Sequence, residues 1–126
     1  MNAKPFAAFA AAFLTLAGAG GASAHHAFNM YDNSRYVSLN GTVKTWVWKN
    51  PHAMLDLVTA TPDGSMETWT VELSSPNIIG RKGWNVDSVK EGDKLSLTLH
   101  PMKDGSKYGL LVSVITPRGQ TLKDKD

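Results

Sequence analysis

Residues 67–84 read ETWTVELSSPNIIGRKGW, and this stretch decides the fold because the spacing of its apolar residues changes half-way. Apolar and polar residues alternate over 67–73, which predicts a strand with one buried face. The apolar positions of that strand are Trp69, Val71 and Leu73. Ser74-Ser75-Pro76-Asn77 then has the form of a helix start, with serine as cap and proline in the first turn. We expect a short helix from Pro76 to about Lys82 that stops at Gly83.

Strand patterns flank this stretch on both sides. Alternating or apolar runs predict four further strands, over 36–49, 53–60, 94–100 and 108–116. Turn residues separate them, among them Pro62-Asp63-Gly64 and the Asp-Gly of 101–107. In the first strand we expect Asn40-Gly41 as a candidate bulge. The charged tail 123–126 is expected to fray.

Five strands with one helix between the third and the fourth predict an all-β fold of a particular kind. This order is typical of a small OB-like antiparallel barrel, a five-stranded Greek-key closure. A small antiparallel sandwich would show similar strand spacing, and that alternative stays open. The length after residue 24 suffices for one core and not for two. We therefore expect a single domain over 25–126.

The N-terminus has the pattern of an export signal. A short start with one positive charge, Lys4, precedes an uninterrupted apolar run from Pro5 to Ala24, and Ala22 and Ala24 suit signal peptidase. We expect residues 1–24 to be a cleavable signal peptide and the mature domain to be periplasmic or secreted, with no stable membrane anchor. An uncleaved anchor is the alternative, since the run is just long enough to span a membrane.

Composition excludes several classes of function. The chain has no cysteine, so disulfides, thiolate metal sites and cysteine catalysis are absent. Its net charge is +2, and loss of Lys4 with the signal peptide would lower it to +1. That balance gives no electrostatic footprint for nucleic acid.

Cleavage after Ala24 would make His25 the first residue, and this predicts a metal site. The α-amine and imidazole of His25 could then chelate one ion, with His26 as a further nitrogen donor. His52, in Asn50-Pro51-His52, is the expected donor from the domain, and Glu72 is expected as a ligand or as the group that orients a histidine. Such nitrogen donors suit copper best, with zinc and nickel as alternatives. His100 is a weaker candidate.

Other functions have weaker support. Trp46 and Trp48 are expected to share the face opposite Val43, where they could bind a protein partner or small ligand as a non-catalytic module. Core packing is the interpretation we favour for these rings. No catalytic motif is present, so enzymatic activity is not expected, although an oxidative copper enzyme cannot be separated from a copper carrier by sequence.

Several motifs together resemble a family of small secreted bacterial proteins of unknown function. They are A-H-H-A-F at 24–28, G-T-V at 41–43, W-x-N-P-H at 48–52, E-L-S-S-P-N at 72–77, G-W at 83–84, K-x-G-D at 90–93 and P-x-x-D-G at 101–105. The resemblance implies an exported, one-domain OB-like barrel. It also implies a site at His25, His26, His52, Glu72, Ser75, Pro76 and Asn77. The family has serine where this chain has Ala27, so a role for a hydroxyl there is in doubt.

The function expected from the sequence is therefore binding or delivery of a metal ion, copper first, in the periplasm. A periplasmic protein that receives or supplies the metal is the expected partner.

Overall fold

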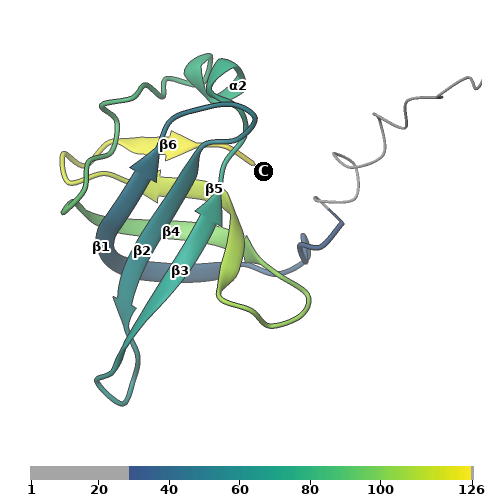
Figure 1. The fold of residues 1–126 in the computed structure, drawn as a ribbon, viewed down its shortest axis with the longest axis vertical. Helices are drawn as coiled ribbons and strands as arrows, with labels where there is room; N and C mark the ends of the chain where they lie inside the picture. The colour runs from purple at the N-terminus through teal and green to yellow at the C-terminus, as the bar shows by residue number, and fades with distance from the viewer. Residues whose placement is uncertain (1–28, 126) are drawn as a thin grey trace, which may run out of the picture.

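Six strands and one short helix make up residues 29–125, which are the residues that the computed structural model describes. The strands are β1 (Val37–Val47), β2 (Met54–Ala60), β3 (Met66–Glu72), β4 (Lys94–Pro101), β5 (Tyr108–Ile115) and β6 (Thr121–Lys123), and α2 (Pro76–Gly80) lies between β3 and β4 (Figure 1). The five predicted strands are therefore confirmed to within a few residues. In the described part of the chain, no helix has the length and apolar character needed to cross a membrane.

The sheet closes on itself to form a barrel. Its strand order is β3-β2-β1-β4-β5-β6, and β3 also pairs with β5. The closing pair is parallel, with Val71 opposite Gly109, whereas every other pair is antiparallel. The structure confirms the OB-like barrel, with the difference that it is a mixed barrel rather than a wholly antiparallel one. The chain forms one closed sheet and not the alternative sandwich of two sheets.

Strand β1 joins the two halves of the barrel. Its first half pairs with β4 and its second half pairs with β2. The exchange of partners occurs at Thr42, which pairs with both Lys94 and Val58. At the preceding residue, Gly41, an added Cβ would lie 2.4 Å from the carbonyl oxygen of Val58. Glycine is therefore needed at this position because only a residue without a side chain lets the two backbones approach so closely.

The bulge predicted at Asn40-Gly41 is wrong. Both residues pair regularly with β4, and the register instead shifts between Val43 and Thr45. One extra residue, Lys44, therefore reverses which side chains face inward. Beyond it Trp46 packs against the core.

The prediction that Trp46 and Trp48 lie opposite Val43 fails for the same reason. Both rings pack against the same buried cluster as Val43. Thr45 lies on the outer face, where its hydroxyl donates to Asp56 Oδ2 at 2.7 Å. The core interpretation of the tryptophans is therefore the one the packing supports.

The core fills the barrel from all five long strands. Trp84, from the segment after α2, is 3% exposed and stacks on Trp46 with ring centroids 6.1 Å apart. Leu95, Leu97 and Leu99 of β4 are buried, as their alternation predicted. The buried apolar cluster consists of Val43, Ala53, Leu55, Leu57, Trp69, Val71, Leu73, Ile79, Trp84, Val89, Leu95, Leu97, Leu99, Leu111, Val114 and Leu122.

Helix α2 is shorter than predicted and lies across one end of the barrel (Figure 1). It ends at Gly80 rather than near Lys82, and buried Ile79 holds it on the core. Ser75 occupies the N-cap position, but its side chain makes no capping hydrogen bond. The chain reverses at Gly83, which has a φ of 93°.

The expected fraying of the tail is wrong for residues 123–125. Leu122 is buried, and strand β6 pairs with β5. Asp124 is 2% exposed, and its backbone amide donates to the carbonyl of Val112 at 2.9 Å. Leu122 and Asp124 are buried because this segment pairs with β5, and a compositional argument cannot detect such pairing.

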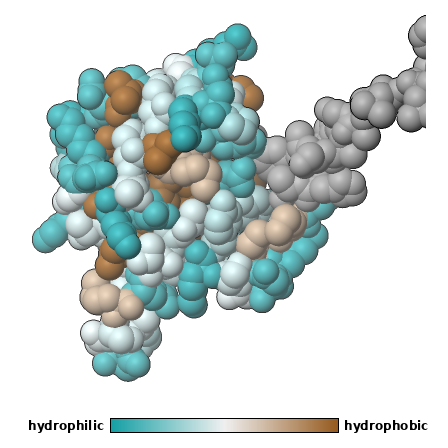
Figure 2. Space-filling model, viewed as in Figure 1, coloured by the Kyte–Doolittle hydropathy of each residue, from teal (hydrophilic) through white to brown (hydrophobic). Residues whose placement is uncertain are grey.

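The surface shows no single large apolar face in the view of Figure 2, where small hydrophobic areas are separated by hydrophilic ones. Among described residues, the large apolar side chains with the greatest exposure are Met30, Tyr36, Met66, Ile78, Val86 and Ile115. Scattered exposed residues of this kind are normal for a folded domain.

Candidate functional site

The connection between β1 and β2 presents His52. The imidazole is 26% exposed, and it follows the cis peptide bond between Asn50 and Pro51. The next residue, Ala53, is bound to the end of β3 by two backbone hydrogen bonds, from its amide to Ser74 O and from the Leu73 amide to its carbonyl. The turn is thus held against the end of the barrel, and the direction of the His52 side chain is defined.

Two acceptors meet the same nitrogen of His52. Nδ1 lies 2.9 Å from Glu72 Oε1 and 3.1 Å from the carbonyl oxygen of Leu73. A backbone carbonyl only accepts hydrogen bonds, so Nδ1 must carry a proton. In the neutral imidazole the lone pair then resides on Nε2, which is the form in which a histidine binds a metal through Nε2 while a carboxylate orients it.

Glu72 connects His52 to the start of the described chain. Its carboxylate, at the end of β3, is 13% exposed. Oε1 faces His52, and Oε2 accepts a hydrogen bond from the hydroxyl of Tyr31. Both oxygens are therefore engaged by side chains from separate segments. We call Tyr31, Glu72 and His52 the Tyr–Glu–His cluster.

Tyr31 is held as a buried donor. It is 2% exposed and stacks on Tyr108, with ring centroids 6.3 Å apart. Burial raises the pKa of Tyr31, and the hydrogen bond to Glu72 and the charge of that carboxylate raise it further. Burial and the nearby charges of Glu72 and Asp56 raise the pKa of Tyr108 as well. The phenol of Tyr31 therefore keeps its proton and serves as a donor across the neutral range.

A shallow pocket of about 360 Å³ borders the cluster. Most of its surface is carbon, with hydroxyl and amine groups among its lining. It is lined by Pro51, His52, Ser74, Ser75, Ile78 and Lys125. The ring of His52 therefore forms part of a concave surface, as expected of a residue that meets a ligand.

The predicted site is brought together in part. His52 and Glu72, 20 positions apart in the sequence, are in direct contact. Ser75 lines the adjacent pocket, whereas Pro76 and Asn77 begin α2. His25 and His26 lie outside the described residues. Within residues 29–125 no three His, Cys, Asp or Glu side chains are grouped as a metal site would require.

His100 lies in a different environment from His52. It is 2% exposed, its Nδ1 is 2.8 Å from the carbonyl oxygen of Arg35, and its ring contacts that of Tyr36 at 4.7 Å between centroids. It is therefore a packed residue of β4.

Sequence reasoning missed Tyr31. The segment 25–34 (HHAFNMYDNS) has no clear period, so its pattern predicts no buried residue. The signal that could have found Tyr31 is weak, since a single tyrosine in an aperiodic segment does not reveal a distant carboxylate partner. Only the closed barrel brings Tyr31 to the end of β3.

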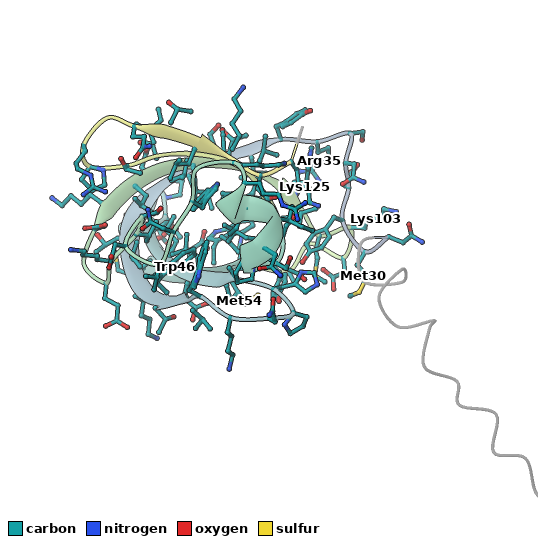
Figure 3. All side chains as sticks on the ribbon, turned by 90° about the horizontal axis from the view of Figure 1, so that it is seen from above. Met30, Arg35, Trp46, Met54, Lys103 and Lys125 are labelled. Atoms are coloured by element: carbon teal, nitrogen blue, oxygen red, sulfur yellow. The ribbon has the colours of Figure 1, made fainter. Side chains whose placement is uncertain are left out.

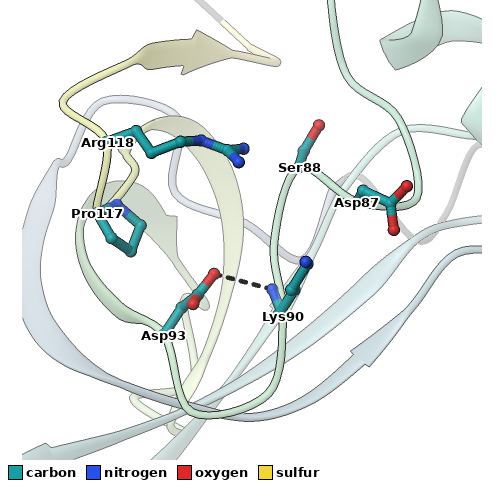
Figure 4. Close-up of a pocket in the computed structure, with 6 residues that line it drawn as sticks. All are labelled: Asp87, Ser88, Lys90, Asp93, Pro117 and Arg118. Carbon is teal, nitrogen blue, oxygen red and sulfur yellow. Dashed lines mark hydrogen bonds between the residues drawn. The ribbon is translucent and has the colours of Figure 1, made fainter.

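Another depression lies between the α2–β4 connection and the β5–β6 turn (Figure 4). It has a volume of about 180 Å³ and carries two acids, Asp87 and Asp93, and two bases, Lys90 and Arg118. Asp93 Oδ2 accepts a hydrogen bond from the amide of Lys90 at 3.0 Å, the contact drawn in Figure 4. That carboxylate stabilises its own turn, and the Tyr–Glu–His cluster is the better candidate for chemistry.

Comparison with known proteins assigns the chain to a family. A model described as a family of unknown function, DUF6152, matches residues 13–113. The chain belongs to this family. No curated protein matches this DUF6152 chain. Among solved structures it is similar to the mitochondrial single-stranded DNA binding protein Rim1 of S. cerevisiae. That match has 13% identity and a TM-score of 0.47, and it covers 71% of the DUF6152 chain and 96% of the other.

Proposed function

We propose that this protein binds a metal ion, copper first, in the periplasm after removal of residues 1–24. His25 provides its α-amine and imidazole, and His26 and His52 provide further imidazole nitrogens. Zinc and nickel are the alternatives that these donors allow. The protein acts in binding or delivery, with a periplasmic protein as donor or acceptor of the metal.

The observation that carries the proposal is the pairing of His52 with Glu72. Their contact of 2.9 Å, with the Leu73 carbonyl at 3.1 Å, assigns the proton to Nδ1 and the lone pair to Nε2. Orientation of this kind is typical of metal-binding histidines, whose other nitrogen donates to a carboxylate or carbonyl.

The same geometry favours one of the two roles expected for Glu72. Its two oxygens already accept from Tyr31 and His52. A carboxylate engaged in this way is better suited to orient a ligand than to bind the ion directly. Glu72 is therefore assigned the orienting role.

The path of the chain supports a contribution from the N-terminal histidines. Tyr31, which is hydrogen-bonded to Glu72, is only five residues after His26 and six after His25. Five extended residues span roughly 17 Å. The terminal donors are thus tethered within reach of the carboxylate that also contacts His52.

Copper titration of the mature protein, followed by electron spin resonance, tests the proposal. Mass spectrometry first establishes that the secreted chain begins at His25. We expect one Cu²⁺ bound with a nitrogen-rich hyperfine pattern, and weaker binding in His52→Ala. Competition with Zn²⁺ and Ni²⁺ ranks the metals.

A chain made without residues 1–24 that retains its initiator methionine before His25 is the matched control. It keeps all four histidines and the whole domain, but the amine of His25 becomes an amide. We expect its copper affinity to fall at least tenfold because the chelate ring is lost. A mature start other than His25, or an affinity unchanged by His52→Ala, would refute the proposal.

A further inference from the structure

The arm of residues 30–32 is attached to the β4–β5 hairpin by backbone hydrogen bonds. The amide of Lys103 donates to the carbonyl of Met30 at 2.9 Å, and the amide of Asp32 donates to Pro101 O at 2.8 Å. Tyr31 lies opposite Met102 in an antiparallel bridge. Figure 3 shows Met30 and Lys103 close together where the chain enters the barrel. The arm therefore behaves as a short additional edge strand.

One side chain connects this arm to the cluster. The hydroxyl of Tyr31 donates to Glu72, and its ring is stacked on Tyr108. The backbone bonds fix where the arm lies along the hairpin, whereas the phenol ties it to the carboxylate that orients His52. Tyr31 is thus the side chain through which the position of the arm and the orientation of His52 depend on each other.

We infer that Tyr31 is a positioning residue, which docks the arm so that the terminal nitrogen donors and His52 reach one metal ion. The inference rests on the proposed function. With the arm docked, six residues separate His25 from its anchor at Tyr31. With the arm released, the first anchored residue is Arg35, whose carbonyl oxygen lies 2.8 Å from His100 Nδ1, and the tether lengthens to ten residues.

A longer tether lowers the effective concentration of the terminal donors at His52. For a flexible chain this concentration falls roughly as the −3/2 power of length, so lengthening the tether from six to ten residues lowers it about twofold. Loss of the arm's fixed direction adds to this cost. Removing the Tyr31 hydroxyl should therefore weaken copper binding by roughly two- to tenfold.

Two variants that each lose only a hydroxyl provide the test. Tyr31→Phe keeps the aromatic ring and removes the donor to Glu72. Tyr108→Phe is the matched control, because it keeps the other ring of the stack and its hydroxyl makes no hydrogen bond among residues 29–125. We expect Tyr31→Phe to lower copper affinity and to alter the hyperfine pattern. Tyr108→Phe should leave both at the wild-type values.

Hydrogen exchange supplies a second, reciprocal readout that mere loss of stability would not mimic. If arm docking and metal binding are coupled, copper must slow exchange of the Asp32 and Lys103 amides, since both hold the arm. We expect this slowing in the wild type and a smaller one in Tyr31→Phe. The measurement on the wild type is informative even if the variant does not fold.

The outcomes separate the two proposals. If the mature protein binds no copper, or binds it independently of His52, the proposed function and this inference both fall. If copper binds through His25 and His52 but Tyr31→Phe matches the wild type in affinity and hyperfine pattern, only the role of Tyr31 is wrong. Unchanged exchange of the Asp32 and Lys103 amides on copper binding would overturn the inference by itself.

Discussion

The carboxylate of Asp124 accepts a hydrogen bond from the backbone amide of Ser74, which is 2.7 Å away although 50 positions earlier in the chain. Asp124 follows β6, and Ser74 follows β3, immediately after the Leu73 carbonyl that meets His52. The C-terminal segment therefore stabilises the segment after β3 to which the His52 turn is hydrogen-bonded.

We predict that Asp124→Ala lowers the free energy of unfolding by about 1–3 kcal/mol, because it leaves the buried Ser74 amide without its acceptor. Urea unfolding followed by tryptophan fluorescence measures the change. Asp124→Asn is the control, since it keeps an acceptor oxygen for Ser74. It should lower the free energy of unfolding clearly less than Asp124→Ala does. Equal stability of Asp124→Ala and the wild type would contradict this role.

Gly41 is predicted to be essential for closure of the barrel. An added methyl group would meet Val58 O at 2.4 Å and a side-chain carbon of Leu57 at 2.8 Å, and the backbone cannot yield cheaply. Gly41→Ala should therefore cost about 2 kcal/mol or more in unfolding free energy.

Gly80→Ala is the control for that substitution. Nothing lies within 4 Å of its added methyl group, and Gly80 ends a helix with no positive φ. Because alanine favours helix, we expect the free energy of unfolding of Gly80→Ala to be unchanged or to rise by up to about 1 kcal/mol. Thermal and urea unfolding of Gly41→Ala and Gly80→Ala measure the two changes in stability. Similar losses of stability in both variants would argue against the close approach at Gly41.

The metal-free protein is predicted to lose stability at alkaline pH through Tyr31. Its pKa in the folded protein is raised above the value of about 10 in the unfolded chain, so the contribution is fully present below pH 10. Above that pH the unfolded chain releases a proton that the folded chain retains. Stability then falls by about 1.4 kcal/mol per pH unit for this group.

Tyr31→Phe removes this titrating group. It should be less stable than the wild type at pH 7, because it lacks the hydrogen bond to Glu72. Between pH 10 and about 12 its stability should decline less steeply, by the slope of one proton. Urea unfolding at a series of pH values gives both slopes, and equal slopes would show that Tyr31 ionises normally in the folded protein.

The tautomer of His52 is predicted to be the one with the proton on Nδ1. Glu72 and the Leu73 carbonyl both accept at this nitrogen. Nitrogen-15 spectra of the metal-free protein at mildly alkaline pH should show Nε2 without a proton. Glu72→Ala should shift the population toward the opposite tautomer, and a wild-type spectrum with the proton on Nε2 would remove the main support for metal binding.

The sequence by itself determined the five long strands along the chain, the single helix after β3 and the fold class, because alternation and turn chemistry are local properties of the chain. It also singled out His52 and Glu72 from their residue types. It placed the bulge wrongly and put Trp46 on the wrong face, because a one-residue shift at Lys44 depends on pairing with a distant strand.

Only the tertiary structure decided which side chains meet. The parallel contact of β3 with β5 closes the barrel and brings the β4–β5 hairpin, with the arm attached to it, to the end of β3. Tyr31, Glu72 and His52 therefore converge, and Asp124 is buried with its carboxylate on the Ser74 amide. Convergence of this kind is set by barrel closure, which no local pattern encodes.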